Sequence, residues 1–304
     1  MSDFHHVRHV KEQSKSRKVL WFTLILTAIF AIVEIIGGFI SNSLALLSDA
    51  GHMISDVLAV SLSLIAIKMA TRPSNARYTF GYLRFEMIAS FLNGLTLCII
   101  SIWIFIEGFR RIFQPEPIDL PIMLTVAGIG LIVNLALTLA LSHSIKNENN
   151  LNVRSALWHF IGDLLSSIGV IVSALLIWWT SFTWFDPLIS LFIGIIIFIG
   201  GARITKEAYL VLMESVPAQF NLEEIRSDLL SIRGIKDVHE MHLWSISTDH
   251  HSLTAHIFID DSNENFDVIT AINELLQQKY GIEHSTIQSE HIDIHPHGDY
   301  GKQH

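Results

Sequence analysis

The chain of 304 residues is 50% hydrophobic and only 16% charged, whereas a soluble globular domain carries about 25% charged residues, so the composition argues against a wholly soluble protein. The formal net charge of −9 provides no basic surface of the kind that binds nucleic acid. Because Cys98 is the only cysteine, one chain can build neither a disulfide framework nor a cysteine-based zinc cluster. Metal chemistry must therefore use His, Asp and Glu.

Six stretches are apolar enough to cross the hydrocarbon core of a membrane, which takes about 20 residues of helix. The third and fourth contain no Asp, Glu, Lys or Arg. The first is too long for a signal peptide and continues into a second span, so we expect it to be retained. The six predicted transmembrane helices are Val19–Ile40, Leu44–Ile67, Met87–Ile106, Leu120–Leu141, Ala156–Trp179 and Phe185–Gly201.

The loops between these spans predict the orientation in the membrane. Basic residues gather in the N-terminal tail, in the second and fourth loops and after the sixth span, whereas the first and fifth loops have none. The positive-inside rule then places both termini in the cytoplasm. We expect a multi-pass protein of the cell membrane, the inner or plasma membrane.

The chemistry of the chain changes near Met213 to Pro217. Residues 1–210 carry 15 basic and 13 acidic side chains, whereas residues 211–304 carry 5 and 16, together with ten of the 16 histidines. We therefore expect a cytoplasmic tail over residues 1–18, a six-helix membrane domain over 19–210 and a cytoplasmic domain over 211–304.

The periodicity of the last part predicts a small α+β domain. Two amphipathic segments read as helices, the first with Asn221 as a cap and the second ending at Gly281, and three alternating segments read as strands. The order αββαβ suits a ferredoxin-like arrangement of helices on one face of a sheet. The predicted elements are helix 221–232, strand 238–247, strand 252–260, helix 265–280 and strand 286–294.

Two of the spans carry a histidine and an aspartate in the same pattern. The second span has His52 and Asp56, and the fifth has His159 and Asp163. A carboxylate near the bilayer centre costs about 2.5–3.5 kcal/mol on insertion scales, so such groups need a purpose. Residues four apart share one helix face. Two such helices side by side would bring two imidazoles and two carboxylates together.

This set of ligands predicts a transition metal. Four nitrogen and oxygen ligands form the tetrahedral arrangement that Zn²⁺ prefers, whereas calcium and magnesium require more oxygen ligands or retained water. We expect Zn²⁺, with Cd²⁺ and Co²⁺ as alternatives. Asp49, three residues before His52, would crowd a tetrahedral site as a fifth ligand, so we expect it to orient a ligand or to lie at the entrance. Direct ligation by Asp49 is the alternative.

Three segments carry a family resemblance: Ser43–Asp56, Tyr78–Glu86 and His159–Asp163. Together they resemble the cation diffusion facilitator family, particularly its bacterial zinc-resistance branch, and the resemblance covers nearly the whole chain. It implies a homodimeric carrier, not an enzyme, that exports cytoplasmic Zn²⁺ in exchange for external protons. The transport-site positions of the family match His52, Asp56, His159 and Asp163.

The same resemblance implies roles for residues near and inside the cytoplasmic domain. Arg84 and Glu214 match a charge pair that interlocks at the membrane–cytoplasm junction of the family's dimer, although two solvated charges are the alternative. His239, His256 and Glu290 match a cytoplasmic zinc site, for which an acidic, soluble surface is the alternative. Regular strand alternation would place His239 and His242 on opposite faces.

The competing functions are a membrane-embedded zinc hydrolase and a membrane-anchored metal sensor. A hydrolase needs an open metal position and a general base, commonly in the pattern HExxH, which the chain lacks. A sensor's anchor has no need of charged pairs inside two spans.

The nucleotide-binding pattern GxxxxGK[ST] is also missing, so we expect no nucleotide. Because protons and metal compete for imidazole and carboxylate, a site that opens alternately to each side would act as an antiporter.

Overall fold

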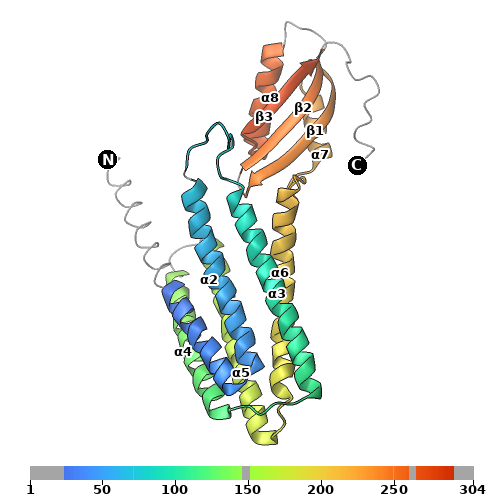
Figure 1. Cartoon of the computed structure of the whole chain (residues 1–304). Coiled ribbons are helices and arrows are strands. Elements are labelled where there is room, and N and C mark those ends of the chain that lie inside the picture. The colour runs from blue at the N-terminus through green and yellow to red at the C-terminus, as the bar shows by residue number, and fades with distance from the viewer. Residues whose placement is uncertain (1–23, 71, 146–150, 249, 260–264, 291–304) are drawn as a thin grey trace, which may run out of the picture. The chain divides into compact units, whose positions relative to one another are not determined.

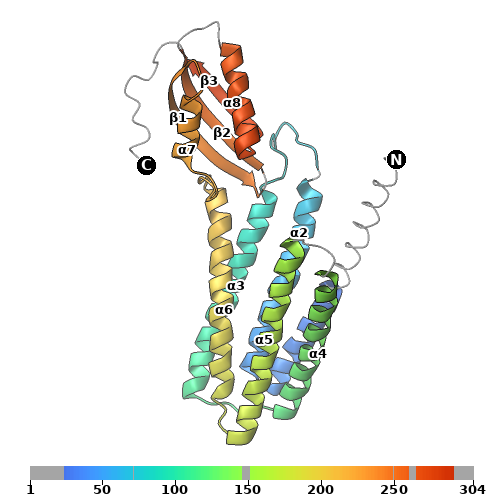
Figure 2. The same ribbon diagram turned by 180° about the vertical axis from the view of Figure 1, so that it is seen from behind.

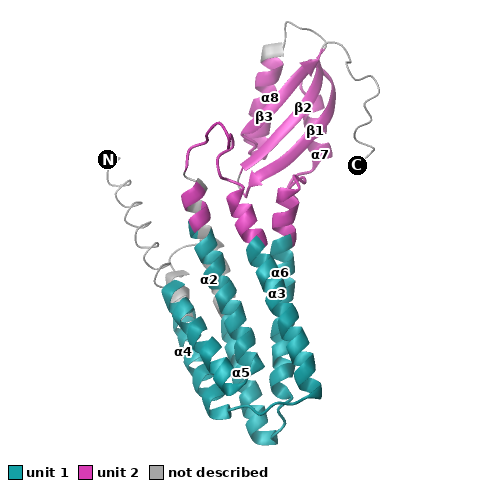
Figure 3. Cartoon of the chain, in the orientation of Figure 1, with its two compact units in different colours: residues 1–64, 92–205 teal, residues 65–91, 206–304 magenta. Residues whose placement is uncertain are grey.

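The computed structural model describes residues 24–70, 72–145, 151–248, 250–259 and 265–290 (Figure 1). Within these ranges the side chains of residues 63, 67, 70, 137, 140–145, 151–161, 265 and 266 lie outside the description. The chain divides into two compact units (Figure 3). Unit 1 comprises residues 1–64 and 92–205, and unit 2 comprises residues 65–91 and 206–304. The predicted tail over residues 1–18 falls outside the described residues.

Long apolar helices make up unit 1 and extend from it. A helix over Leu24–Ser41 comes first. The later helices run past the apolar spans predicted from the sequence, because turns that contain polar or charged residues continue them. Five helices of the described chain are long and apolar enough to cross a membrane, and in α4 the apolar run is Leu120–Ala136. The labelled helices are α2 (Leu44–Ala70), α3 (Phe85–Phe113), α4 (Leu120–Ile145), α5 (Leu151–Thr180) and α6 (Phe185–Leu212).

A tight turn separates the first helix from α2. Asn42 adopts a left-handed backbone conformation with φ of 55°, which asparagine tolerates better than most residues. Arg111 of α3 holds this turn, because its Nη1 donates to the Asn42 carbonyl at 2.6 Å and its Nη2 to Asn42 Oδ1 at 3.0 Å. Ser43 then caps α2 by accepting from the Leu46 N–H at 3.2 Å.

The packing of α3 on α6 depends on two glycines. A Cβ added at Gly201 would lie 2.7 Å from Leu97 Cβ and 3.0 Å from the Gly94 carbonyl oxygen, and one added at Gly94 would lie 2.8 Å from the Gly201 carbonyl. Small residues let helix backbones approach closely, as is common between transmembrane helices. Figures 1 and 2 both draw these two helices side by side.

The order αββαβ predicted for the last part of the chain is confirmed. A three-stranded sheet has the order β1-β2-β3, in which β1 and β2 are antiparallel and β2 and β3 are parallel. The Asn221 side chain accepts from the N–H groups of Glu223 and Glu224 and so caps the first helix. The elements are α7 (Leu222–Leu230), β1 (Ile235–Ser247), β2 (His250–Ile259), α8 (Asn265–Tyr280) and β3 (His284–Glu290).

Both helices of this domain pack on the same face of the sheet (Figure 2). Ile225 and Leu229 of α7 and Ile272 of α8 are fully buried against alternate residues of β2 such as Ile257. Fully burying one such side chain stabilises a fold by about 1.5–3 kcal/mol. The remaining residues of β2, including His256, therefore face away from the helices.

Candidate metal sites

The predicted pair on α2 converges with an aspartate of α5. The Nε2 atom of His52 lies 3.3 Å from Asp163 Oδ1 and 3.9 Å from Asp56 Oδ2. One ligand atom from each of the three residues lies within 4.8 Å of the others. Bonds of about 2.1 Å to a tetrahedral zinc ion would put neighbouring ligand atoms roughly 3.4 Å apart. The spacing therefore fits one small cation.

His159 belongs to the same predicted set. Its backbone lies in α5, four residues before Asp163 and thus one helical turn away. Its side chain lies outside what the structure describes, so its place as the fourth ligand stays a prediction.

Asp49 lies apart from the converging ligand atoms. It is 1% exposed, and its Oδ2 accepts from the Ser167 hydroxyl at 3.4 Å. Ser167 Oγ in turn accepts from Asn134 Nδ2 at 3.0 Å. This chain of hydrogen bonds joins α2, α5 and α4 beside the site.

The sequence reasoning missed two buried acids of unit 1. Glu34, in the helix over Leu24–Ser41, is 0% exposed, and so is Asp186 at the start of α6. Asp186 accepts hydrogen bonds from Ser43 and from the Leu44 and Ala45 N–H groups. The available signal was a lone carboxylate inside or at the edge of an apolar span. Placing an ionisable group there costs free energy, so such a residue indicates a structural or functional role.

A second group of ligand atoms gathers in the cytoplasmic domain. His239 Nε2 lies 3.4 Å from Glu290 Oε2, and His256 Nδ1 lies 2.9 Å from Glu290 Oε1. Glu290 is 2% exposed, while the two histidines are half-buried. Among the described residues, this trio and the trio of His52, Asp56 and Asp163 are the groups whose atoms could hold an ion.

An irregularity in β1 corrects the expectation that His239 and His242 lie on opposite faces. His239 pairs with His256, and His242 pairs with Thr254, so three steps along β1 match two along β2. The extra residue is a β-bulge, and Glu240 within it has a φ of 45°. Because the two partners on β2 share one face, His239 and His242 share it also.

Electrostatics keep the Glu290 carboxylate ionised. Burial alone would raise the pKa of Glu290, but the hydrogen bond from Gln288 and the neighbouring His239 and His256 rings outweigh it and hold the pKa below its ordinary value. Glu240 adds a further acid here, with Oε2 3.6 Å from His256 Nε2. An ionised carboxylate between imidazoles is a donor set that Zn²⁺ favours.

Arg84 and Glu214 form a salt bridge within unit 2. Arg84 precedes α3, and Glu214 follows α6 with a left-handed φ of 57°. Their side chains are 43% and 56% exposed, so the pair contributes at most about 1 kcal/mol.

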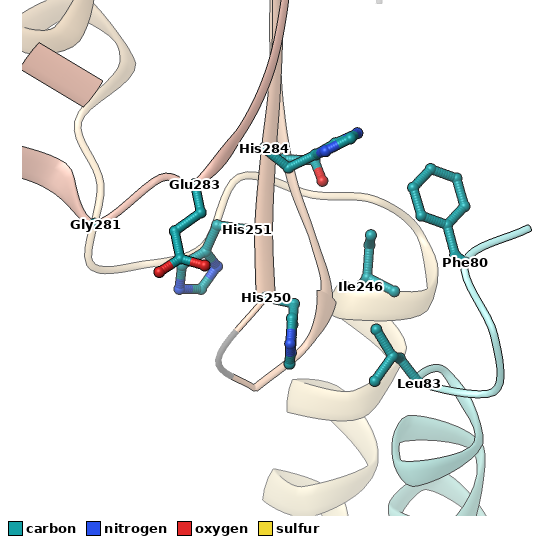
Figure 4. Close-up of a pocket in the computed structure, with 9 residues that line it drawn as sticks. Phe80, Leu83, Ile246, His250, His251, Gly281, Glu283 and His284 are labelled. Carbon is teal, nitrogen blue, oxygen red and sulfur yellow. The ribbon is translucent and has the colours of Figure 1, made fainter. Parts of the chain in front are cut away.

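A pocket of about 300 Å³ also lies in unit 2 (Figure 4). Three histidines line it, but His251 already has Nδ1 2.8 Å from Ser245 Oγ and Nε2 3.0 Å from Gln219 Nε2. In Figure 4 the rings of His250 and His284 point in different directions. The histidines of the lining are therefore not arranged around one ion. The lining consists of Phe80, Leu83, Ile246, His250, His251, Ser252, Gly281, Glu283 and His284.

Two family models match the chain in succession. Residues 20–213 match the cation efflux transmembrane domain, and residues 217–292 match the cytoplasmic domain of cation efflux proteins. A solved structure titled as the metal-bound C-terminal domain of the CzcD transporter from Cuprividus metallidurans is 32% identical. It covers 23% of this chain and 99% of its own, with a TM-score of 0.23.

Named relatives match over almost their whole length. A Bacillus subtilis protein named cadmium, cobalt and zinc/H(+)-K(+) antiporter is 38% identical over 95% of this chain and 93% of its own. The zinc transporter ZitB of Escherichia coli is 35% identical over 97% and 93%, and the metal cation efflux system protein CzcD of Cupriavidus metallidurans is 37% identical over 90% and 87%. These matches confirm the family resemblance of the sequence. The chain is a multi-pass membrane protein that belongs to the cation efflux family.

Proposed function

We propose that the protein exports Zn²⁺ from the cytoplasm in exchange for external protons by alternating access. The observation that carries this proposal is the convergence of His52, Asp56 and Asp163 from two apolar helices onto a space that fits one cation. His159, one turn from Asp163, completes a tetrahedral set in the proposal. Asp49 orients this set through Ser167.

Proton exchange follows from the chemistry of the ligands. Zn²⁺ requires neutral imidazole and ionised carboxylate, so each proton that binds His52 or Asp163 opposes the metal. A site that faces the cytoplasm with metal and the exterior with protons exchanges one for the other. The inward proton gradient then drives export. The names of the relatives support this choice, since the Bacillus subtilis protein is named for H⁺ and for cadmium, cobalt and zinc. Cd²⁺ and Co²⁺ are accordingly alternative substrates.

The proposal includes a layout in the membrane. Residues 1–18 and 211–304 lie in the cytoplasm, and residues 19–210 form the membrane domain. The cytoplasmic domain binds Zn²⁺ at His239, His256 and Glu290 as a regulatory ligand, and it joins two chains into a homodimer. The salt bridge of Arg84 with Glu214 interlocks the charges at the junction of the membrane and the cytoplasm.

Zn²⁺ flux into proteoliposomes tests the function, measured with an imposed pH gradient and without one. We expect gradient-dependent flux that falls more than about tenfold in Asp163→Asn, since even the outer partners of metal ligands are worth roughly 10–100-fold. Asp119→Asn is the matched control, because it removes an exposed acid at the start of α4. Flux that ignores the gradient, or that survives Asp163→Asn, would overturn the proposal.

A further inference from the structure

Glu34 is the buried acid of unit 1 that the proposed ligand set does not use. Its side chain is 0% exposed, and within the described chain neither Oε1 nor Oε2 has a hydrogen-bond partner. A buried polar group without a partner costs free energy, and an ionised one costs far more. The position therefore needs a reason beyond packing, because an apolar residue of similar size would avoid this cost.

The surroundings of Glu34 enclose its carboxyl group. A Cβ added at Gly130 of α4 would lie 3.1 Å from Glu34 Oε1 and 2.7 Å from Phe30 Cζ. The absence of a side chain at Gly130 thus makes the room that this carboxyl occupies. Phe30, one turn earlier on the same helix, is 4% exposed and closes the space beside it.

The charges around Glu34 come from the candidate metal site and its support. Those that act on it are Asp49 on α2 and Asp163 on α5, both acidic, while α4 presents Gly130. With no cation in the site, an ionised Glu34 would be repelled by two carboxylates in a low-dielectric interior, so the neutral acid is favoured. With a divalent cation held between His52 and Asp163, the positive charge of the ion favours an ionised Glu34 instead.

We propose that Glu34 is a proton carrier of the metal–proton exchange that does not itself bind the metal. When the cation enters, the O–H bond of the Glu34 carboxylic acid breaks and its proton passes to water. When the cation leaves, a proton from the external solution re-forms that bond. This inference rests on the proposed function and adds a titrating group to it.

The test counts the protons that Zn²⁺ displaces. Purified full-length protein in detergent is titrated with Zn²⁺ by calorimetry in buffers of different ionisation enthalpy, which gives the protons released per ion bound. We expect Glu34→Gln to release about one proton fewer than wild type when Zn²⁺ binds, because glutamine has no carboxylic acid proton to lose. Its zinc affinity should stay within about threefold of wild type. Glu34→Asp keeps an exchangeable proton and should restore the count, and Asp119→Asn should leave it unchanged.

The outcomes separate this inference from the proposed function. If wild type binds Zn²⁺ and releases protons but Glu34→Gln releases the same number, Glu34 is a structural acid and the inference fails alone. If wild type releases no protons, the proposed exchange itself fails. Should the glutamine variant not fold, the infrared carbonyl band of protonated carboxylic acids decides the matter. In wild type, zinc should reduce the intensity of this band. In Glu34→Asp, the band that zinc reduces should lie at a different frequency, because the protonated acid is an aspartic acid. Identical zinc-induced difference spectra for the two proteins would overturn the inference.

Discussion

The Ser43 hydroxyl donates a hydrogen bond of 2.6 Å to Oδ1 of Asp186 and joins the start of α2 to the start of α6. The same carboxylate accepts from the Leu44 N–H at 2.7 Å and the Ala45 N–H at 3.2 Å. Three donors thus satisfy a fully buried charge. The first N–H groups of α2, which have no acceptor within the helix, and the helix dipole also favour an anion there.

Asp186→Asn should destabilise unit 1. The amide keeps one acceptor oxygen but turns a donor group toward the N–H groups of α2, so we expect the free energy of unfolding to fall by about 2–3 kcal/mol. Denaturant titration in detergent, followed by tryptophan fluorescence, measures this change. Asp119→Asn is the control, since it makes the same substitution at the exposed start of α4. Equal stability of the two variants would show that the Asp186 contacts contribute little.

Gly201→Ala should weaken the packing of α3 on α6. The added methyl would lie 2.7 Å from Leu97 Cβ and 3.0 Å from a backbone oxygen of Gly94, so the helices must separate at a cost of about 1–3 kcal/mol. Gly200→Ala is the matched control, because its Cβ meets no atom within 4 Å. Thermal unfolding in detergent should show a lower midpoint for Gly201→Ala alone, and a shared midpoint would contradict the close contact.

Glu290→Gln should weaken zinc binding by the cytoplasmic domain. Glu290 faces both His239 and His256, and loss of its charge removes the ligand they share. We expect the dissociation constant to rise by more than about tenfold. Calorimetry of the full chain in an Asp163→Asn background isolates this site. The exposed His242, substituted by alanine, serves as the control on the same face of the sheet. An unchanged affinity in Glu290→Gln would remove the assignment.

The contact of α7 with α8 should depend on pH through Asp228. Hydrogen bonds donated by Lys279 and Tyr280 hold the pKa of Asp228 below its ordinary value, and the hydrogen bonds of Lys279 with Asp228 and Tyr280 raise the pKa of Lys279. A lowered carboxyl pKa stabilises the fold above the unfolded value of about 4 and ceases to do so as pH falls through the folded value. The raised Lys279 pKa stabilises below about 10 and is lost at higher pH.

Hydrogen–deuterium exchange of the full chain tests this pH dependence. At neutral pH, Asp228→Asn should exchange faster than wild type over α7 and α8. The difference should begin to shrink near pH 4 and vanish once the pH falls below the lowered pKa of Asp228 in the folded state. The control is Glu274→Gln, which changes an exposed acid in the middle of α8. A difference that persists in acid would mean that packing, rather than the charge of Asp228, holds the helices together.

The helices and strands were largely predictable because their signals are local. A span such as that of α3 is apolar over its whole crossing length, and Asn221 and Gly281 mark helix ends by their own chemistry. The predicted helix over residues 265–280 agrees with α8. The rule that residues four apart share a helix face pairs His52 with Asp56 on α2, but it does not by itself place that face against Asp163 of α5.

The features that the sequence did not reveal depend on contacts between distant segments. Asp186 is explained by Ser43, 143 positions earlier, and Glu34 by the space at Gly130. No local pattern encodes either partner. The bulge in β1 was missed for another reason: strand alternation was assumed to be regular, whereas a non-glycine residue at positive φ, such as Glu240, cannot be foreseen from composition.

Which side chains of β1 share a face depends on the bulge as well as on the order of the residues. His239 and His242 share a face only because one extra residue lies between them. Deleting Met241 would leave the two histidines two positions apart, a spacing at which a regular strand also keeps both on one face. Regular alternation with all residues retained would instead send one of the two imidazoles to the helix-covered side. The two histidines therefore stay on one face when the extra residue and the bulge are lost together, but not when the bulge alone is lost.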